Sequence, residues 1–318
     1  NPVWIMRQAG RYLPEFKEIR KKNPNFIELC LNHKLSSEIT LQPIKRFDLD
    51  AAIIFSDILM LPYGLNQKVD FKKNFGPVLG NLDIGIMSKI DEIDFVEKIY
   101  PIYKAIKSVS SKMTSMNKNT IGFVGAPWTL LVYMINQQSP KKNVKKDFFK
   151  DDFLINRILL IIEKFLKIHI KNQIENGANI IQIFDSWAGL LEERDYPNYI
   201  YTPTLNLVDY VKSLNVPVIC FPREIRNYKE FCEIVKPDAI NIDYSVDPLM
   251  ISKNIKIPVQ GGLDPKILLT DKENLKKEIL KYLDIFKDHP YIFNLGHGIL
   301  PETNPDMVEF LIKTVKDY

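Results

Sequence analysis

Short apolar runs alternate with helix-length amphipathic segments along most of the chain, and this alternation limits the possible folds more than any other feature. The runs lie at 51–55, 121–124, 179–184, 216–221, 239–242, 257–260 and 291–295. Each is continuously apolar or nearly so, as in AAIIF and NIIQIF, which is typical of a strand covered on both faces. Strands that alternate with helices indicate βαβ units and a parallel sheet.

The segments between these runs have the spacing of amphipathic helices. From 153 to 176, Ile and Leu recur at three- and four-residue intervals, and the stretch 266–286 does the same among lysines and glutamates. The visible runs provide seven strands, and we expect an eighth in the irregular stretch 67–79. A single closed (β/α)8 TIM barrel explains these units. A doubly wound open sheet competes, but no glycine-rich phosphate turn follows the first strand.

Length and composition agree with one barrel domain over residues 1–318. The chain has 318 residues, of which 46% are hydrophobic, and no internal repeat or linker divides it. It begins within a motif and without an initiator methionine, so we expect a further N-terminal segment upstream of residue 1. The predicted compartment is the cytoplasm or a plastid.

Several classes of protein are disfavoured by charge and cysteine content. The net charge is only +4, and no basic run is interleaved with aromatics as in a nucleic-acid groove. The densest positive cluster, Lys141–Lys146, is expected to be a solvated loop. The three cysteines, Cys30, Cys220 and Cys232, are scattered, which fits a reducing compartment. No apolar run approaches the length of a membrane span.

Polar side chains follow most of the apolar runs. In a barrel, these positions meet at the carboxyl ends of the strands, where the chemistry collects. The residues are Ser56, Asp57, Thr129, Asp185, Ser186, Asp243, Tyr244, Asp264 and His297, while the run from 216 leads instead into Arg223. This placement predicts a ligand site at that end of the barrel.

Some of these residues have simpler explanations. Asp264 directly precedes Pro265 and a long helical pattern, so we expect it to be a helix cap. That explanation is weaker for Asp57, because the apolar stretch 58–61 follows it rather than an obvious helix. Tyr133 has helical spacing and could be a core aromatic. His297, one of four histidines, lies between two glycines, where the backbone can approach a ligand closely.

The N-terminal stretch NPVWIMRQAGRYLPEFK carries two arginines and an amide within five residues. Arg7 and Arg11 flank Gln8 and a flexible Ala-Gly pair, and a guanidinium matches a carboxylate bidentately, as lysine cannot. The alternative is a surface turn whose arginines are solvated or pair with Glu15 and Glu18. The motif favours binding of planar carboxylates.

The complete set of motifs resembles the uroporphyrinogen decarboxylase family. Besides MRQAGRYLPEF, the chain contains DAAIIFSDIL, GFVGAPWTLLVYM, QIFDSWAG, VQGGLDP and NLGHGILPETNP, in the order of the family. The resemblance extends from residue 2 to about 315. It implies a homodimeric (β/α)8 barrel that removes four acetate carboxylates from uroporphyrinogen III, giving coproporphyrinogen III and four CO2 without a cofactor or metal.

The resemblance also assigns residues to the site. It places Arg7, Gln8, Arg11 and Arg20 along the substrate cleft, Asp57 at the pyrrole nitrogens, and Tyr133, Ser186 and His297 against the tetrapyrrole. Asp57 and Arg7 are the expected catalytic pair, and no catalytic role passes to Asp185.

One segment departs from the family pattern. The family has a glycine-containing turn where this chain reads FPREIRN, with Arg223, Glu224 and Arg226. We expect this departure to affect the shape of the loop and a contact between its rim and a substrate carboxylate, but not the matched motifs.

The chemistry explains why these residue types are needed. A protonated pyrrole can accept the electrons released with CO2, so the substrate is its own electron sink. A fixed anion such as Asp57 would stabilise the cation by preorganised electrostatics. Arg7 could position the reacting acetate or act as the acid, and the second role requires a strongly perturbed guanidinium.

Two alternatives remain open. A zinc-dependent corrinoid or thiol methyltransferase of the same superfamily would need histidine and cysteine ligands, and no cysteine lies within sixty residues of His297. A non-catalytic, porphyrin-binding barrel would not need Arg7, Arg11, Asp57 and His297 together.

Overall fold

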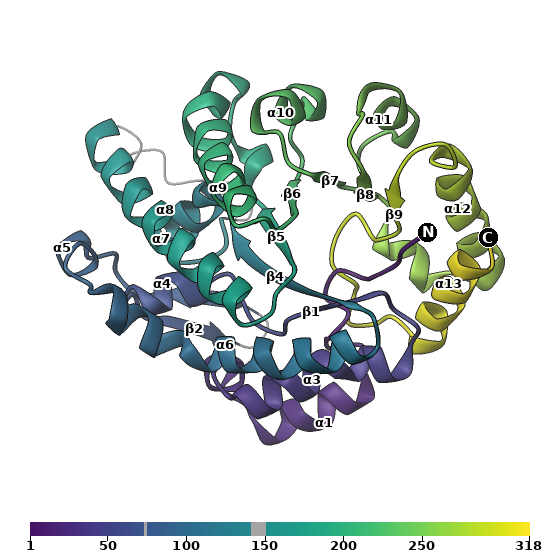
Figure 1. Cartoon of the computed structure of the whole chain (residues 1–318), viewed down its shortest axis with the longest axis horizontal. Coiled ribbons are helices and arrows are strands. Elements are labelled where there is room, and N and C mark those ends of the chain that lie inside the picture. Colours follow the sequence, from purple (N-terminus) through teal and green to yellow (C-terminus); the bar gives the residue numbers. More distant parts are fainter. Residues whose placement is uncertain (73–74, 141–150) are drawn as a thin grey trace.

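The computed structural model describes residues 1–72, 75–140 and 151–318, so the predicted loop Lys141–Lys146 lies outside the described residues. Its centre is a curled sheet of seven parallel strands in the order β1-β4-β5-β6-β7-β8-β9 (Figure 1). The strands are β1 (Ala51–Ile53), β4 (Asn119–Gly125), β5 (Ile180–Asp185), β6 (Val218–Pro222), β7 (Ala239–Ile242), β8 (Val259–Gly261) and β9 (Tyr291–Ile292). Each overlaps one of the seven predicted apolar runs, which confirms them and the parallel α/β fold.

The two edges of the curled sheet are bridged by the N-terminal segment. The N–H of Phe293, just after β9, donates to the carbonyl of Pro2 at 2.8 Å, and Val3 forms a parallel bridge with Phe293. On the other side, the N–H of Asp50, just before β1, donates to the carbonyl of Val3 at 2.9 Å. Residues 2–4 therefore take the eighth position of the barrel.

The prediction of an eighth barrel strand within 67–79 was wrong. That stretch contains β2 (Val69–Lys72) and β3 (Gly76–Leu79), which form a separate antiparallel pair. Most residues of this pair are partly or fully exposed, whereas β7 is buried throughout. A barrel strand needs apolar residues on both faces, and this hairpin has them on one face at most.

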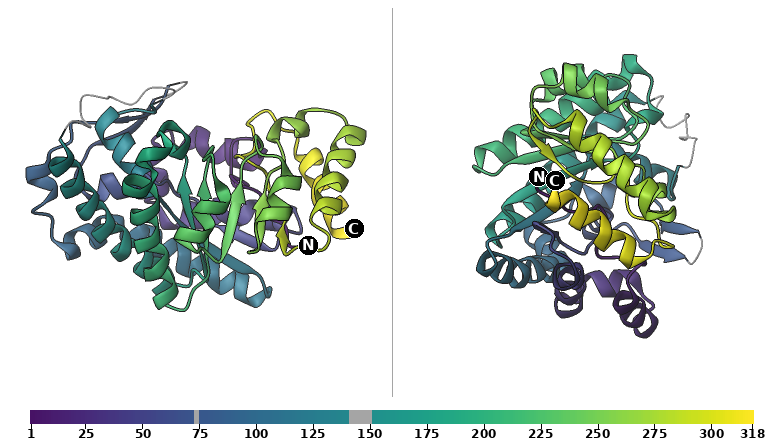
Figure 2. Two further views of the ribbon diagram at one scale, coloured as in Figure 1. Left: turned by 90° about the horizontal axis from the view of Figure 1, so that it is seen from above. Right: turned by 90° about the vertical axis from the view of Figure 1, so that its right-hand side faces the viewer.

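Helices surround the outside of the sheet (Figures 1 and 2). They are α1 (Pro14–Lys22), α2 (Phe26–Cys30), α3 (His33–Arg46), α4 (Met60–Gly64), α5 (Ile84–Met87), α6 (Glu92–Ser115), α7 (Pro127–Asn136), α8 (Asp152–Glu175), α9 (Thr202–Ser213), α10 (Tyr228–Val235), α11 (Pro248–Asn254), α12 (Lys272–Ile285) and α13 (Pro305–Asp317). The helix predicted from 153 is confirmed as α8. None of the described helices is long and apolar enough to cross a membrane.

The helix expected over 266–286 is divided in two. A 3-10 turn, η5 (Pro265–Leu269), precedes α12, and the side chain of Asp271 caps α12 by accepting the N–H of Asn274 at 2.8 Å. Asp264 caps η5 by accepting the N–H of Lys266 at 2.9 Å, as predicted. A cap within the pattern ends one helical segment and starts the next.

The N-terminal segment also fills the interior of the barrel. Trp4 and Met6 belong to an inner cluster with Ile53, Ile121 and Phe221. The indole N–H of Trp4 donates to Oε1 of Gln260 on β8 at 2.8 Å, so the buried polar atom is satisfied. This anchoring places the following residues, which carry the arginine motif, at the carboxyl end of the sheet.

Candidate active site

A tight turn presents Arg7 at the end of the N-terminal segment. The N–H of Gln8 donates to the carbonyl of Ile5 at 2.8 Å, and Arg7 has a φ of 64°, which is uncommon for a residue other than glycine. The buried side chain of Gln8 accepts the N–H of Ile5 and donates to the carbonyl of Ala51, both at 3.0 Å. Gln8 thus ties the turn to β1, and its predicted contact with substrate stays a prediction.

The Arg7 guanidinium has no hydrogen-bond or ion-pair partner among the described residues. Its side chain is exposed, yet desolvation by the surrounding protein lowers its pKa, while the nearby Asp57 acts to raise it. Gly298 allows this placement, because a Cβ there would lie 2.3 Å from Cδ of Arg7. The N–H of Ile299 donates to the carbonyl of Met6 at 3.0 Å and holds the two loops together.

Asp57 lies after β1 and is half-buried. Its Oδ1 accepts the N–H of Leu59 at 2.9 Å, and Leu59 directly precedes α4 (Met60–Gly64). A short helix therefore does follow, and Asp57 supports its start, contrary to the expectation for 58–61. Burial raises the pKa of Asp57 to about 6, against the Leu59 hydrogen bond and Arg7, which lower it. At neutral pH this carboxyl is mostly ionised.

Tyr133 and His297 belong to the same electrostatic group. Tyr133, on α7, is half-buried and packs edge-on against Trp187 at 6.0 Å; burial, and then Asp57, raise its pKa. The half-buried His297 has a buried Nδ1 without a hydrogen-bond partner in the described structure. Burial, and then Arg7, lower its pKa to about 3, so its imidazole is neutral at pH 7.

The remaining predicted residues are less closely linked to this group. Arg11 is exposed and near enough to Arg7 to lower its pKa. Arg20, on α1, donates to the carbonyl of Asn23 at 2.5 Å, and its guanidinium carbon lies 5.7 Å from the ring centre of Phe26. Ser186 is half-buried at the end of β5.

Sequence reasoning noted Arg223 in the segment that departs from the family pattern but did not assign it to the site. It directly follows β6, and its charge contributes to lowering the pKa of both Arg7 and His297. Its position at a strand end was the available signal. Asp243, after β7, accepts the N–H of Glu224 at 2.8 Å and so fixes the loop that carries Arg223.

Asp185 is buried beside Ser186 but faces the helix layer. The hydroxyl of Thr129 on α7 donates to its Oδ1 at 2.6 Å, and its Oδ2 has no partner within the described residues. Burial raises the pKa of Asp185 to about 7. This geometry makes Asp185 a link between β5 and α7.

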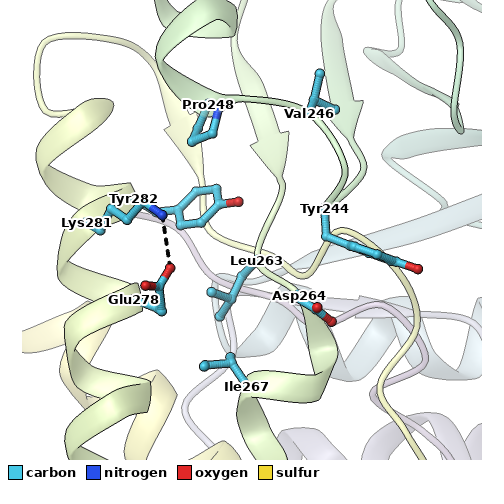
Figure 3. A pocket seen from close by; sticks show the side chains of 9 residues that line it. All are labelled: Tyr244, Val246, Pro248, Leu263, Asp264, Ile267, Glu278, Lys281 and Tyr282. Carbon is cyan, nitrogen blue, oxygen red and sulfur yellow. Dashed lines mark hydrogen bonds and ion pairs between the residues drawn. The ribbon is translucent and has the colours of Figure 1, made fainter.

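A separate pocket of about 240 Å³ lies outside the group of predicted residues (Figure 3). Its wall includes the ion pair between Glu278 and Lys281, at 3.2 Å, and Tyr282, whose hydroxyl donates to the carbonyl of Gly262 at 2.6 Å. Tyr244 and Asp264, which follow predicted strands, line it, but none of the residues that the family resemblance assigns to the substrate does. The chemistry indicated by the sequence therefore gathers elsewhere, around Arg7 and Asp57.

Comparison with known proteins decides the family. The model of the family described as "Uroporphyrinogen decarboxylase (URO-D)" matches residues 1–318. The chain belongs to the uroporphyrinogen decarboxylase family. The enzyme of that name from Rickettsia bellii is 43% identical, with 100% of this chain and 95% of the relative covered. The Rickettsia felis enzyme is 41% identical, covering 100% and 93%.

Membership in the uroporphyrinogen decarboxylase family establishes the activity expected from the motifs. The chain is a carboxy-lyase of haem biosynthesis that decarboxylates uroporphyrinogen. In the part of the chain that the structure describes, no three His, Cys, Asp or Glu side chains are grouped as metal ligands would be. The family match itself favours decarboxylation over the zinc-dependent methyltransferase alternative.

Solved structures support the fold alone. A methyltransferase from Methanosarcina mazei superposes with a TM-score of 0.77 at 15% identity, covering 94% of this chain and 90% of that one. A B12-independent methionine synthase from Shewanella has a TM-score of 0.59 at 11% identity, covering 90% and 86%. At such low identity, the likeness carries no functional conclusion.

Proposed function

We propose that Asp57 and Arg7 carry the decarboxylation of uroporphyrinogen and that no metal or organic cofactor takes part. The observation that supports this most is their proximity: the charges of Asp57 and Arg7 act on each other's pKa, and this guanidinium has no hydrogen-bond or ion-pair partner among the described residues. Asp57 would face the pyrrole nitrogens, and Arg7 would bind a carboxylate of the substrate.

The proposed reaction uses the substrate as its own electron sink. A proton adds to the pyrrole ring, and the bond between the acetate methylene and its carboxylate then breaks. The electron pair enters the ring system while CO2 leaves. The exocyclic carbon takes up a proton to become a methyl group, and loss of the ring proton restores the pyrrole. Asp57 would stabilise the cationic ring through charge already in place before the reaction.

The arginines would bind the carboxylates of the tetrapyrrole. Arg7 and Arg11 can each offer a bidentate pair of N–H donors. Because the guanidinium of Arg7 is unpaired among the described residues, its donors are available without breaking a protein contact. Burial lowers its pKa, which favours proton donation, but we assign Arg7 to positioning and leave the acid unassigned.

The other predicted residues would orient the substrate. His297, neutral at pH 7, can donate from one ring nitrogen and accept at the other. Tyr133 and Ser186 would contact the acetate or propionate arms, and Arg20 would add a further cation. Gln8 would act through the turn that presents Arg7.

Assembly and compartment are part of the same proposal. The family resemblance supports a homodimer with the tetrapyrrole as its small-molecule partner. The bacterial origin of the relatives supports the cytoplasm as the compartment, with a plastid as the alternative.

The substitution Asp57→Asn tests this proposal. It keeps the shape and the backbone hydrogen bond but removes the charge, so we expect a loss of about a hundredfold or more in kcat with little change in thermal stability. Asp264→Asn is the matched control, because Asp264 also accepts an N–H two residues ahead at 2.9 Å but lies outside the site. Near-normal kcat for Asp57→Asn would leave Asp57 only a structural role, through its hydrogen bond to Leu59.

A further inference from the structure

Arg223 lies across the barrel from Arg7. Counted from the N-terminal segment through β1, β4 and β5, β6 is the fourth strand, and it is also the fourth counted through β9, β8 and β7. Within the described residues, Arg223 is the one cation that directly follows a strand of this sheet. The predicted arginines Arg7, Arg11 and Arg20 all belong to the first 22 residues of the chain, with Arg20 on α1.

The charge of Arg223 acts on the site. It contributes to lowering the pKa of Arg7 and of His297, so its guanidinium shares their surroundings. Cations that disfavour one another in this way are suited to anions placed between them. A cyclic tetrapyrrole carries carboxylates around its whole rim. If arginines bound it from one side only, the carboxylates on the other side would have no cationic partner.

The guanidinium of Arg223 is held but not fully paired. Its side chain is 16% exposed, and one terminal nitrogen pairs with the carboxylate of Glu224. Its Nε is buried and has no hydrogen-bond partner in the part of the chain that the structure describes. An unpaired buried donor is unfavourable, and a guanidinium has five donors, so contacts remain available to an incoming carboxylate.

Glu224 occupies a backbone conformation that favours glycine. Its φ is 61°, in the left-handed region, where a side chain is normally disfavoured. Its N–H donates to Asp243 Oδ2 at 2.8 Å, and its carboxylate meets Arg223. A glycine would fit this turn with less strain but could not hold the guanidinium.

We propose that Arg223 binds a carboxylate of the tetrapyrrole on the side of the site opposite Arg7, and that Glu224 orients its guanidinium. This inference rests on the proposed function, because it places the polycarboxylate substrate across the carboxyl end of the barrel. Arg223 is a binding residue and Glu224 a positioning residue. The segment 221–227, which departs from the family pattern, would thus bind a carboxylate of the substrate.

Steady-state kinetics of Arg223→Ala and Arg223→Lys test the binding role. We expect Arg223→Ala to raise KM for uroporphyrinogen roughly ten- to a hundredfold, with a smaller effect on kcat, and Arg223→Lys to recover part of the loss. The matched control is Arg226→Ala, which removes a charge from the same loop at a residue that pairs with the exposed Glu193 at 3.6 Å. Its KM should be that of the unmodified protein. Equal KM values for Arg223→Ala and Arg226→Ala would overturn the proposal.

Inhibition by coproporphyrinogen identifies the arm. This product keeps the propionates and lacks the acetates, so binding weakened by the same factor in Arg223→Ala would assign Arg223 to a propionate. Unchanged product binding together with a raised KM for the substrate would assign it to an acetate. Loss of kcat alone, with KM and product binding unchanged, would contradict a binding role.

Glu224→Gly keeps the test usable if Arg223→Ala does not fold. It retains Arg223 and relaxes the turn, so we expect unchanged or higher thermal stability and a KM raised several-fold. An unchanged KM would overturn the orienting role of Glu224. Failure of the proposed function would be seen separately, as normal turnover by Asp57→Asn.

Discussion

Arg7 and Asp57 are held in different ways. Asp57 is fixed by a direct hydrogen bond to the Leu59 N–H, whereas Arg7 is placed by its backbone turn and by contact with Gly298. Arg7 therefore keeps its hydrogen-bond donors available. The residue types and their strand-end positions could be predicted from the sequence. The left-handed φ of Arg7 could not, because no glycine marks it.

Lysine substitutions separate the possible roles of the arginines. If Arg7 and Arg11 bind carboxylates, Arg7→Lys and Arg11→Lys each lose bidentate geometry, about 1.5–3 kcal/mol or roughly ten- to a hundredfold in kcat/KM. Steady-state kinetics in light and heavy water measure this. Arg46→Lys is the control, since Arg46 makes a bidentate pair with Glu15 away from the site.

The contrasting outcome is equally specific. If Arg7 were the acid, Arg7→Lys would reduce kcat far more than it raised KM and would alter the solvent isotope effect. Arg11→Lys would change neither in that way. Kinetics like those of the unmodified protein for both variants would make the motif a surface turn.

Asp185 gives a prediction for stability against pH. Its pKa is raised to about 7 in the folded protein, so between about pH 4 and 7 the folded state holds a proton that the unfolded state has lost. The free energy of unfolding should therefore fall as pH rises through this window, by at most about 1.4 kcal/mol per pH unit. In Asp185→Asn this fall should be smaller, as measured by urea unfolding. Asp94→Asn, at an exposed position on α6, is the control and should keep the full dependence. An unchanged slope in Asp185→Asn would contradict a buried, protonated Asp185.

At the scale of elements, the N-terminal segment has three tasks. It pairs with Phe293 and Asp50 at the edges of the sheet, fills the barrel with Trp4, and presents Arg7. The sequence showed the last task only. The segment does contain an apolar run, 3–6, as long as some of the predicted strands, but its pairing with Phe293 joins residues almost the whole chain apart, which no local pattern shows.

The contact between this segment and the loop after β9 can be tested with Gly298→Ala. The added methyl would lie 2.3 Å from Cδ of Arg7, so the side chain must move while the guanidinium remains present. We expect kcat/KM to fall about tenfold, with a small change in Tm, as judged by kinetics and thermal unfolding. Gly85→Ala on α5 is the control, where the methyl meets only Asp83 Oδ1 at 3.2 Å. Losses that simply add when Gly298→Ala is combined with Arg7→Lys would show that the contact does not act through Arg7.

At the scale of the whole molecule, apolar runs and helical spacing were enough for the parallel barrel, because both signals are local. The misplaced strand in 67–79 shows the limit: a hairpin outside the sheet and a barrel strand can share local composition, and only tertiary pairing separates them. Arg223 was named in the sequence but not assigned to the site, for a related reason. Its position opposite Arg7 follows from the order of strands around the barrel, which no single segment encodes.

Cofactor-independent decarboxylation by the whole enzyme is the central claim, and one assay tests it directly. Protein treated with a chelator and stripped of small molecules is incubated anaerobically with uroporphyrinogen, and the oxidised products are separated by chromatography. Because the pyrrole supplies the electron sink, we predict conversion to coproporphyrinogen at the rate of untreated protein. Activity that disappeared with the metal and returned on adding zinc would contradict the account.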